Sequence, residues 1–279
     1  MARATARIFT FKLVRVATAA LSAAAAAIVL PSAALTQDMM RHVNLETPEF
    51  TESSMTRAEL QKKLAELNPG ETLDLTAAAL NGLDMSGLDL RQTKLQSARL
   101  NKTNLSGANL EGVVLDQAWA LKADLSGANL RNASLFMTQL MDAKMDRADL
   151  SGARIAADMS RASLKEALFE KADLSADMTN QSMGLMRGVF KSSDLSGANF
   201  RGANLSRASM EYADLRDADL TGANLMGSEL AGANLTGAIV AESDFSGADV
   251  NSAKLIGLKS LDKARNFDSV KNLDRAFRD

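Results

Sequence analysis

The sequence predicts an all-β solenoid, and three features of residues 75–255 predict it. A large apolar residue returns every five positions, as at Leu95, Leu100 and Leu105. A small residue stands two places before most of these centres, as at Ala98. The aromatic fraction is only 4%, so leucine, methionine and alanine have to fill the interior. A short period sustained over this length is typical of a chain wound into stacked coils.

The repeating unit reads A-[DN]-L-S-G. Its period fits neither an α-helix nor an extended strand, which repeat after about 3.6 and about 2 residues. We expect the leucine and the alanine two places before it to point inward, and the Asp or Asn between them to point outward. Serine and glycine after the centre suit a tight corner, because glycine tolerates unusual backbone angles and serine bonds nearby backbone groups.

These repeats resemble the pentapeptide-repeat family over roughly two thirds of the chain. The resemblance implies an all-β solenoid of one kind, a right-handed quadrilateral β-helix, in which four pentapeptides make a coil of about 20 residues. It also implies about nine coils, stacked about 4.8 Å apart through backbone hydrogen bonds. We assign residues 71–257 to this β-helix and expect short helical caps at both ends.

The N-terminal segment, residues 1–34, has the order of a signal peptide. It holds basic residues but no acidic one, and residues 16–30 are apolar. Ser32 and Ala34 are the small residues of a cleavage site, so we expect cleavage after Ala34 and export to the periplasm or the extracellular space. Alternatives are an uncleaved anchor and a transit peptide to an organelle lumen. We expect no stable membrane insertion, because the apolar run is shorter than the roughly 20 residues that span a bilayer.

The flanks of the repeat are expected to cover the ends of the solenoid, whose exposed edges would otherwise polymerise. Residues 35–55 are assigned to a linker. Residues 56–70 are assigned to an N-terminal capping helix, because Thr56 and Glu59 have the spacing of a capping box. Residues 258–279 are assigned to a C-terminal cap of short helices. A homodimer through this amphipathic end is the alternative use of the same residues.

The frame of five residues breaks near the middle of the repeat. After Ile155 the centres advance by four residues twice, to Met159 and later to Met178, and the frame returns at Leu185. We interpret the short steps as tightened corners and residues 179–184 as a small protruding loop. This loop is either a tolerated insertion or a recognition loop.

Residue types for catalysis and metal binding are scarce. The sequence has no cysteine and a single histidine, His42, so Ser-His-Asp, Cys-His and histidine-based metal sites cannot form within one chain. No phosphate-binding loop or zinc-protease motif occurs. Glu211, Asp214 and Asp219 crowd one coil, but basic residues close by offset them, and we interpret them as a solvated acidic wall. We expect no enzyme activity, no cofactor and no metal.

An outward-facing apolar patch is the candidate protein-contact site, since contiguous exposed apolar residues often mark a contact. Projection of the coil places its members at one corner of two successive coils. They are Val114, Trp119, Leu121, Phe136, Met137 and Met141. Trp119 is the only tryptophan, and tryptophan is favoured at binding hot spots. The competing interpretation is a packing repair, because Ala120 is the weakest centre and a bulge that turns Trp119 or Leu121 inward would fill the space.

These observations favour a non-enzymatic protein that binds a protein partner or serves as a structural rod of the cell envelope. Removal of residues 1–34 takes four of 32 basic residues and none of 34 acidic ones, which leaves 28 against 34 and a net charge of −6. Nucleic acid is not expected as a partner, because its binding needs a basic field. One alternative is an acidic DNA mimic that binds DNA gyrase or topoisomerase, as a branch of the family does. The other is an accessory domain in an enzyme system.

Overall fold

The computed structural model describes residues 44–179 and 186–279. The chain divides into two compact units, Met1–His42 and Val43–Asp279, and every described residue belongs to the second. The predicted signal peptide, the start of the predicted linker and His42 lie outside the described residues. Within the described ranges, no helix has the length and apolar character that crossing a membrane requires.

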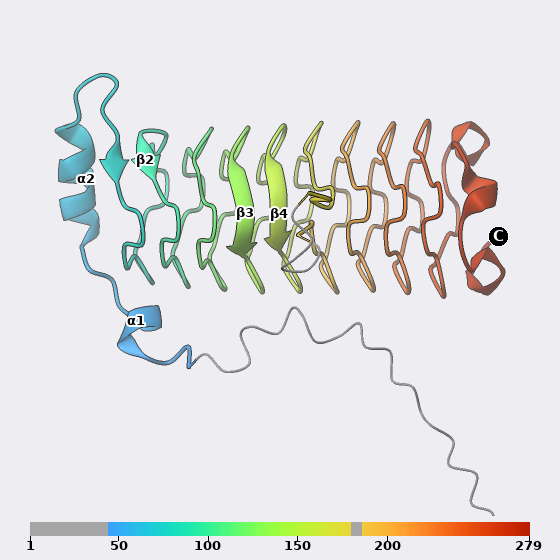
Figure 1. Cartoon of the computed structure of the whole chain (residues 1–279), viewed down its shortest axis with the longest axis horizontal. Helices are drawn as coiled ribbons and strands as arrows, with labels where there is room; N and C mark the ends of the chain where they lie inside the picture. The colour runs from blue at the N-terminus through green and yellow to red at the C-terminus, as the bar shows by residue number, and fades with distance from the viewer. Residues whose placement is uncertain (1–43, 180–185) are drawn as a thin grey trace, which may run out of the picture. The chain divides into compact units, whose positions relative to one another are not determined.

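The described unit is a stack of similar coils with helices at both ends (Figure 1). Its helices and strands are α1 Pro48–Thr51, α2 Arg57–Ala65, β1 Leu73–Asp74, β2 Thr93–Lys94, β3 Ser134–Gln139, β4 Arg154–Asp158 and the 3-10 helices η4 Leu261–Lys263, η5 Phe267–Ser269 and η6 Leu273–Arg275. Strand β1 pairs with β2 and β3 pairs with β4, both in parallel. The other coils are joined by isolated bridges, nearly all parallel.

Successive coils pair with a register of 20 residues, and four pairs per coil define four sides. In the first coils these pairs are Leu73 with Thr93, Ala79 with Arg99, Asp84 with Asn104 and Asp89 with Asn109. The result is the four-sided coil that the family resemblance implies. Two sides are named here by their first outward residue. The Ala79 side continues through Arg99, Trp119, Gln139, Asp158 and Val189, and the Asp84 side through Asn104, Asp124, Lys144, Ser163 and Asp194.

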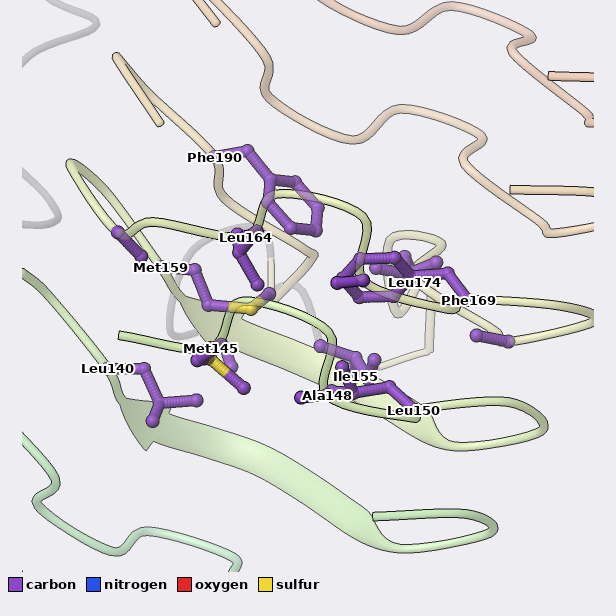
Figure 2. Packing of buried hydrophobic residues seen from close by; sticks show 14 of the residues in the cluster. Leu140, Met145, Ala148, Leu150, Ile155, Met159, Leu164, Phe169, Leu174 and Phe190 are labelled. Atoms are coloured by element: carbon purple, nitrogen blue, oxygen red, sulfur yellow. The ribbon is translucent and has the colours of Figure 1, made fainter. Parts of the chain in front are cut away.

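The repeating centres fill the interior from all four sides. Leu100 and Leu105, from neighbouring sides of one coil, are both completely buried, as is Ala98 beside them. Figure 2 shows such centres from successive coils gathered in the interior, among them Met145, Met159 and Phe169. Larger aromatic centres stack in the same way. The rings of Phe169 and Phe200 lie parallel with centroids 4.6 Å apart, and Phe190 meets Phe169 edge-on at 5.9 Å.

Most corners are turned by a left-handed residue two places after the centre. Gly107 holds this place on the Asp84 side with φ 62°, and Lys102 holds it on the Ala79 side with φ 57°. On the Asp84 side, the outward Asp or Asn also accepts the first backbone N–H of its own corner. Asp84 Oδ1 accepts from Ser86 N at 3.0 Å, and Asp124 Oδ1 accepts from Ser126 N at 3.0 Å. The outward Asp or Asn of the repeat therefore stabilises the corner as well as facing water.

The break in frame differs in part from its prediction. Between β3 and β4 the register shifts after Phe136, so that the first step of four is a shortened corner, as expected. The prediction of a second step of four, with Met178 as a centre, is wrong, because the side chain of Met178 is 49% exposed and does not enter the interior. The ladder on this side passes from Asp158 to Val189, which makes Phe190 the next buried centre. The inter-coil hydrogen bonds continue to Ala176, whose N–H donates to Ser206 O at 3.1 Å, and the corner closes at Gly188, whose N–H donates to Leu174 O at 3.0 Å. The residues added to this coil are therefore 177–187, more than the predicted loop 179–184, most of which lies outside the described residues.

The first coil is covered by α2. Its start has the full capping box, because Thr56 Oγ1 accepts from Glu59 N and the Glu59 carboxylate accepts from Thr56 N. Leu60 is completely buried against the first coil. Arg57 reaches the rim of the β-helix and donates to Asp84 O at 3.1 Å and Ser86 O at 2.9 Å. The helix thereby covers the open interior at this end.

The C-terminal residues continue the ladder with a changed period. The bridging residues Lys259, Arg265, Lys271 and Phe277 follow one another every six residues. Each added residue is taken up by a short 3-10 helix, and these are η4, η5 and η6. The last turn of chain is thus both a coil of the β-helix and the predicted set of short helices.

Candidate protein-contact surface

The predicted patch lies on two adjoining coils. Gln117 N donates to Phe136 O at 2.7 Å, Trp119 forms a parallel bridge with Gln139, and Lys122 N donates to Met141 O at 3.0 Å. The prediction of a single corner is wrong. Phe136 and Met137 occupy the corner before the Ala79 side, whereas Leu121 and Met141 occupy the corner after it, with Trp119 on the wall between. Phe136 and Met141 are five residues apart, which is the length of one side, so they lie at two different corners.

Exposure divides the patch further. Val114 is 39% exposed, Leu121 is only 9% exposed, and Trp119, Phe136, Met137 and Met141 are half-buried. Trp119 also has an aromatic partner from far away in the sequence. The ring of Phe50, on α1, lies with its centroid 5.1 Å from that of Trp119 and is tilted by 42°. The open part of the patch therefore consists of Val114, its most exposed member, the corner of Phe136 and Met137, and Met141.

The packing-repair interpretation does not describe the arrangement around Ala120. Ala120 is buried in frame as a centre, and its N–H donates to Gln139 O at 2.8 Å. Trp119 keeps the outward position, because it bridges Arg99 and Gln139 on the neighbouring coils. The chain therefore does not bulge here, and the tryptophan stays on the outer wall.

Residues 47–54 form an ordered strap across the Ala79 side, although we assigned residues 35–55 to a linker. The strap holds α1, and Ser53 then forms an antiparallel bridge with Leu80 while Ser54 N donates to Ala79 O at 2.8 Å. Thr47 and Pro48 begin the helix, because proline suits a first turn that needs no N–H donor. The linker assignment missed this segment because four helical residues give no periodic signal.

Two buried asparagines hold the strap. Asn81 Nδ2 donates to the carbonyl oxygens of Glu49 and Glu52, both at 3.0 Å, and Asn101 Nδ2 donates to Phe50 O at 3.4 Å. Under the strap these asparagines are 3% and 5% exposed. The other ends of their amides serve the wall. Asn81 Oδ1 accepts from Asn101 N, and Asn101 Oδ1 accepts from Leu121 N, each at 3.1 Å.

The acidic residues that crowd one coil are neutralised by basic partners. Asp214 pairs with Arg216 at 2.6 Å, Glu211 with Lys191 at 2.9 Å, and Asp219 with Arg201 at 3.0 Å. Burial raises the pKa of Glu211, but hydrogen bonds from Ser209 and Lys191 outweigh it and hold this pKa below its ordinary value. The described residues contain no group of three or more carboxylates and imidazoles placed to hold a metal ion. The acidic wall is thus a set of ion pairs.

A second apolar surface lies at the C-terminal end. A hollow of about 550 Å³ is lined by Leu255, Leu258, Leu261, Phe267, Ala276, Arg278 and Asp279. Beside it Phe277 is 57% exposed. This end therefore differs from the N-terminal end, which α2 covers.

The class of protein follows from the coils together with a comparison with known proteins. The stacked four-sided coils define a repeat protein, and a profile of pentapeptide repeats matches it in eight copies. The matched segments are 74–112, 108–147, 123–156, 189–222 and 223–258. Together they cover more than half of the chain. The chain belongs to the pentapeptide-repeat family.

Several solved structures are similar to this chain, whereas no curated protein matches it. HetL, a pentapeptide repeat protein involved in heterocyst differentiation regulation from the cyanobacterium Nostoc sp. strain PCC 7120, is 25% identical; the match covers 80% of this chain and 94% of HetL, with a TM-score of 0.46. QnrB1, a plasmid-mediated fluoroquinolone resistance protein, is 13% identical over 76% of this chain and 92% of its own, with a TM-score of 0.47. A pentapeptide repeat protein from the thylakoid lumen of Arabidopsis thaliana is 28% identical over 43% and 66%, with a TM-score of 0.21.

Proposed function

We propose that this chain is a non-enzymatic pentapeptide-repeat protein of the cell envelope that binds a protein partner through the corner of Phe136 and Met137. One observation carries the proposal. The same corner place holds the polar residues Gln96 and Asp116 on the two preceding coils, a small and buried Ala156 on the next coil, and Ser175 on the coil after that. Phe136 and Met137 interrupt this polar line side by side, within strand β3. Large apolar side chains at such a place favour protein contact over solvation.

The chemistry of the described residues agrees with a binding role. Several of their carboxylates, among them Asp84, Asp124, Asp214 and Asp219, are engaged in corner hydrogen bonds or ion pairs. The location in the envelope rests on residues 1–34 alone. A fusion of residues 1–40 to a reporter enzyme that is active only after export tests it, and an inactive reporter would refute the location without touching the binding proposal.

A photo-crosslinking experiment tests the binding proposal. A photoreactive amino acid is placed at Met137 and, as the matched control, at Arg207, an exposed residue at the equivalent corner place of a later coil. In the native host we expect a defined crosslinked product from position 137, and its loss when Phe136→Asp is added. Equal products from both positions, or a product that survives Phe136→Asp, would refute this surface as the contact.

The alternative of an acidic DNA mimic is less well supported. Such a mimic needs a dense and unbalanced row of negative charge, since DNA carries one charge per about 1.7 Å. Here acids such as Asp142 and Asp149 pair with arginines of the adjoining coil. We expect the purified chain to leave gyrase supercoiling unchanged in the assay, and inhibition at stoichiometric concentration would favour the mimic instead.

We also propose that the C-terminal end forms a homodimer, since Phe277 and the adjoining hollow leave apolar surface at that end. Phe277→Asp should then convert a dimer to a monomer in analytical ultracentrifugation. A monomeric parent chain would end this proposal.

A further inference from the structure

We propose that the wall beneath the strap is a peptide-docking site, which takes a short helical turn carrying a Glu-Phe pair and which α1 occupies in the free protein. The inference deepens the proposed function, because it names a second contact surface and the chemistry of what binds there. The site consists of Asn81, Asn101, Arg99 and Trp119 on three successive coils of the Ala79 side.

The site recognises the end of a helix through amide donors. The last carbonyl groups of a helix have no partner within it. Asn81 and Asn101 stand one coil apart and supply Nδ2 donors to three such carbonyls, those of Glu49, Phe50 and Glu52. The amide oxygens of both asparagines are fixed by backbone N–H groups of the wall. The donors are therefore held in place whether or not the strap is bound.

Side-chain chemistry adds selectivity beyond the carbonyl contacts. Trp119 presents its ring to Phe50, and aromatic pairs favour such tilted contacts. Arg99 Nη1 lies 3.8 Å from Glu49 Oε1, which selects for an acidic residue just before the aromatic one. An acidic and aromatic pair at the end of a helical turn is the ligand that this wall fits.

The strap is held weakly enough to be exchanged. Helix α1 has four residues and none of them is buried, so little apolar surface stabilises it. Its N-cap residue, Thr47, makes no capping hydrogen bond with its side chain. Beneath it, Arg99 Nε is buried and has no hydrogen-bond partner. A segment with few buried apolar contacts opens at low free energy, and an incoming peptide that also satisfies Arg99 would bind better than α1 does.

Trp119 makes the proposal testable, because it is the only tryptophan of the chain. The probe is a synthetic peptide of residues 44–56 with a dansyl acceptor on its N-terminus, and the signal is energy transfer from Trp119. In a Phe50→Ala chain we expect Trp119 emission to shift to longer wavelength and the peptide to bind saturably. The parent chain should bind the peptide about tenfold more weakly, because its own strap competes at high local concentration.

Two variants separate docking from mere structural support. A Phe50→Ala, Asn81→Ala, Asn101→Ala chain should lose peptide binding, whereas the matched Phe50→Ala, Asn104→Ala, Asn109→Ala chain, with as many asparagines removed from other sides, should keep it. Circular dichroism confirms that both are folded. The proposal is overturned if the peptide fails to bind the Phe50→Ala chain, if a peptide lacking Phe50 binds equally, or if binding survives loss of Asn81 and Asn101. None of these results bears on crosslinking at position 137, so the two proposals fail separately.

Discussion

The Ala79 side and the Asp84 side are built from the same repeat inside and differ in what they present outside. On the Asp84 side, Asp84, Asn104 and Asp124 each close their own corner and face water. On the Ala79 side the equivalent places hold Ala79, Arg99 and Trp119, none of which can accept a corner N–H.

Asparagines of the preceding coil take over this task on the Ala79 side. Asn81 and Asn101 each close the corner of the next coil, which leaves their Nδ2 groups free to bind a carbonyl from outside. The same exchange occurs at Asp116, which accepts from Phe136 N at 3.0 Å. The difference teaches that a coil keeps its corners when the outward Asp or Asn is lost, provided that its neighbour supplies an acceptor. The outward position that no longer needs Asp or Asn can then hold a residue that contacts another segment.

The largest expected effect concerns the interior, where we expect the two sides to contribute equally to the free energy of unfolding. Leu100 on the Ala79 side and Leu105 on the Asp84 side belong to one coil and are both completely buried. Each Leu→Ala change should lower the free energy of unfolding by about 2–5 kcal/mol, because it removes burial and leaves a cavity. Urea denaturation measures both. Costs that differ by more than about 2 kcal/mol would mean that the outer difference reaches the interior.

A second test concerns the corners themselves. Asn101→Ala should cost about 1–3 kcal/mol, because it leaves the buried N–H of Leu121 unpaired. Asn104→Ala is the control and should cost about 0.5–1 kcal/mol, since its half-buried corner lets water replace the lost acceptor at Ser106. Equal losses in urea denaturation would contradict the distinction between the two kinds of corner.

The interior was predictable from the sequence and the outer contacts were only partly so. A period of five fixes which side chains point inward, because each centre repeats the environment of the last, and Leu100 or Ala98 could be placed from spacing alone. Phe50 could not be placed, since its contact with Trp119 joins residues 69 positions apart without a periodic signal. A signal for the strap did exist in Asn81 and Asn101, which replace the usual corner Ser or Thr at a spacing of one coil.

Two other misses have specific causes. Met178 fits the spacing of a centre by chance, and an apolar residue inside an insertion cannot be told from a centre by period. At the C-terminus, Leu261, Phe267 and Leu273 repeat every six residues, so a period of five does not describe this segment.

A third test compares polar groups inside the two sides. Thr103, on the Asp84 side, donates to Leu80 O at 2.7 Å, whereas Ser228, on the Ala79 side, is completely buried with its Oγ unpaired. Ser228→Ala should raise the free energy of unfolding by about 1 kcal/mol, and Thr103→Ala should lower it by about 1 kcal/mol. Opposite shifts in the thermal midpoint are the expected readout. A loss of stability in Ser228→Ala would show that its hydroxyl has a partner in solution.

The smallest expected effect is a difference between the two sides in how the free energy of unfolding depends on pH. Hydrogen bonds from Ser86, assisted by the charge of Arg57, hold the pKa of Asp84 below its ordinary value. A carboxyl whose pKa is lower in the folded state adds stability above its unfolded pKa of about 3.9 and loses it as the pH falls through the folded value. The asparagines of the Ala79 side do not titrate. Asp84→Asn should therefore reduce the loss of stability between about pH 5 and pH 2, measured by urea denaturation, while Asn81→Ala should leave that pH slope unchanged. An unchanged slope in Asp84→Asn would mean that its corner hydrogen bond contributes equally in both protonation states.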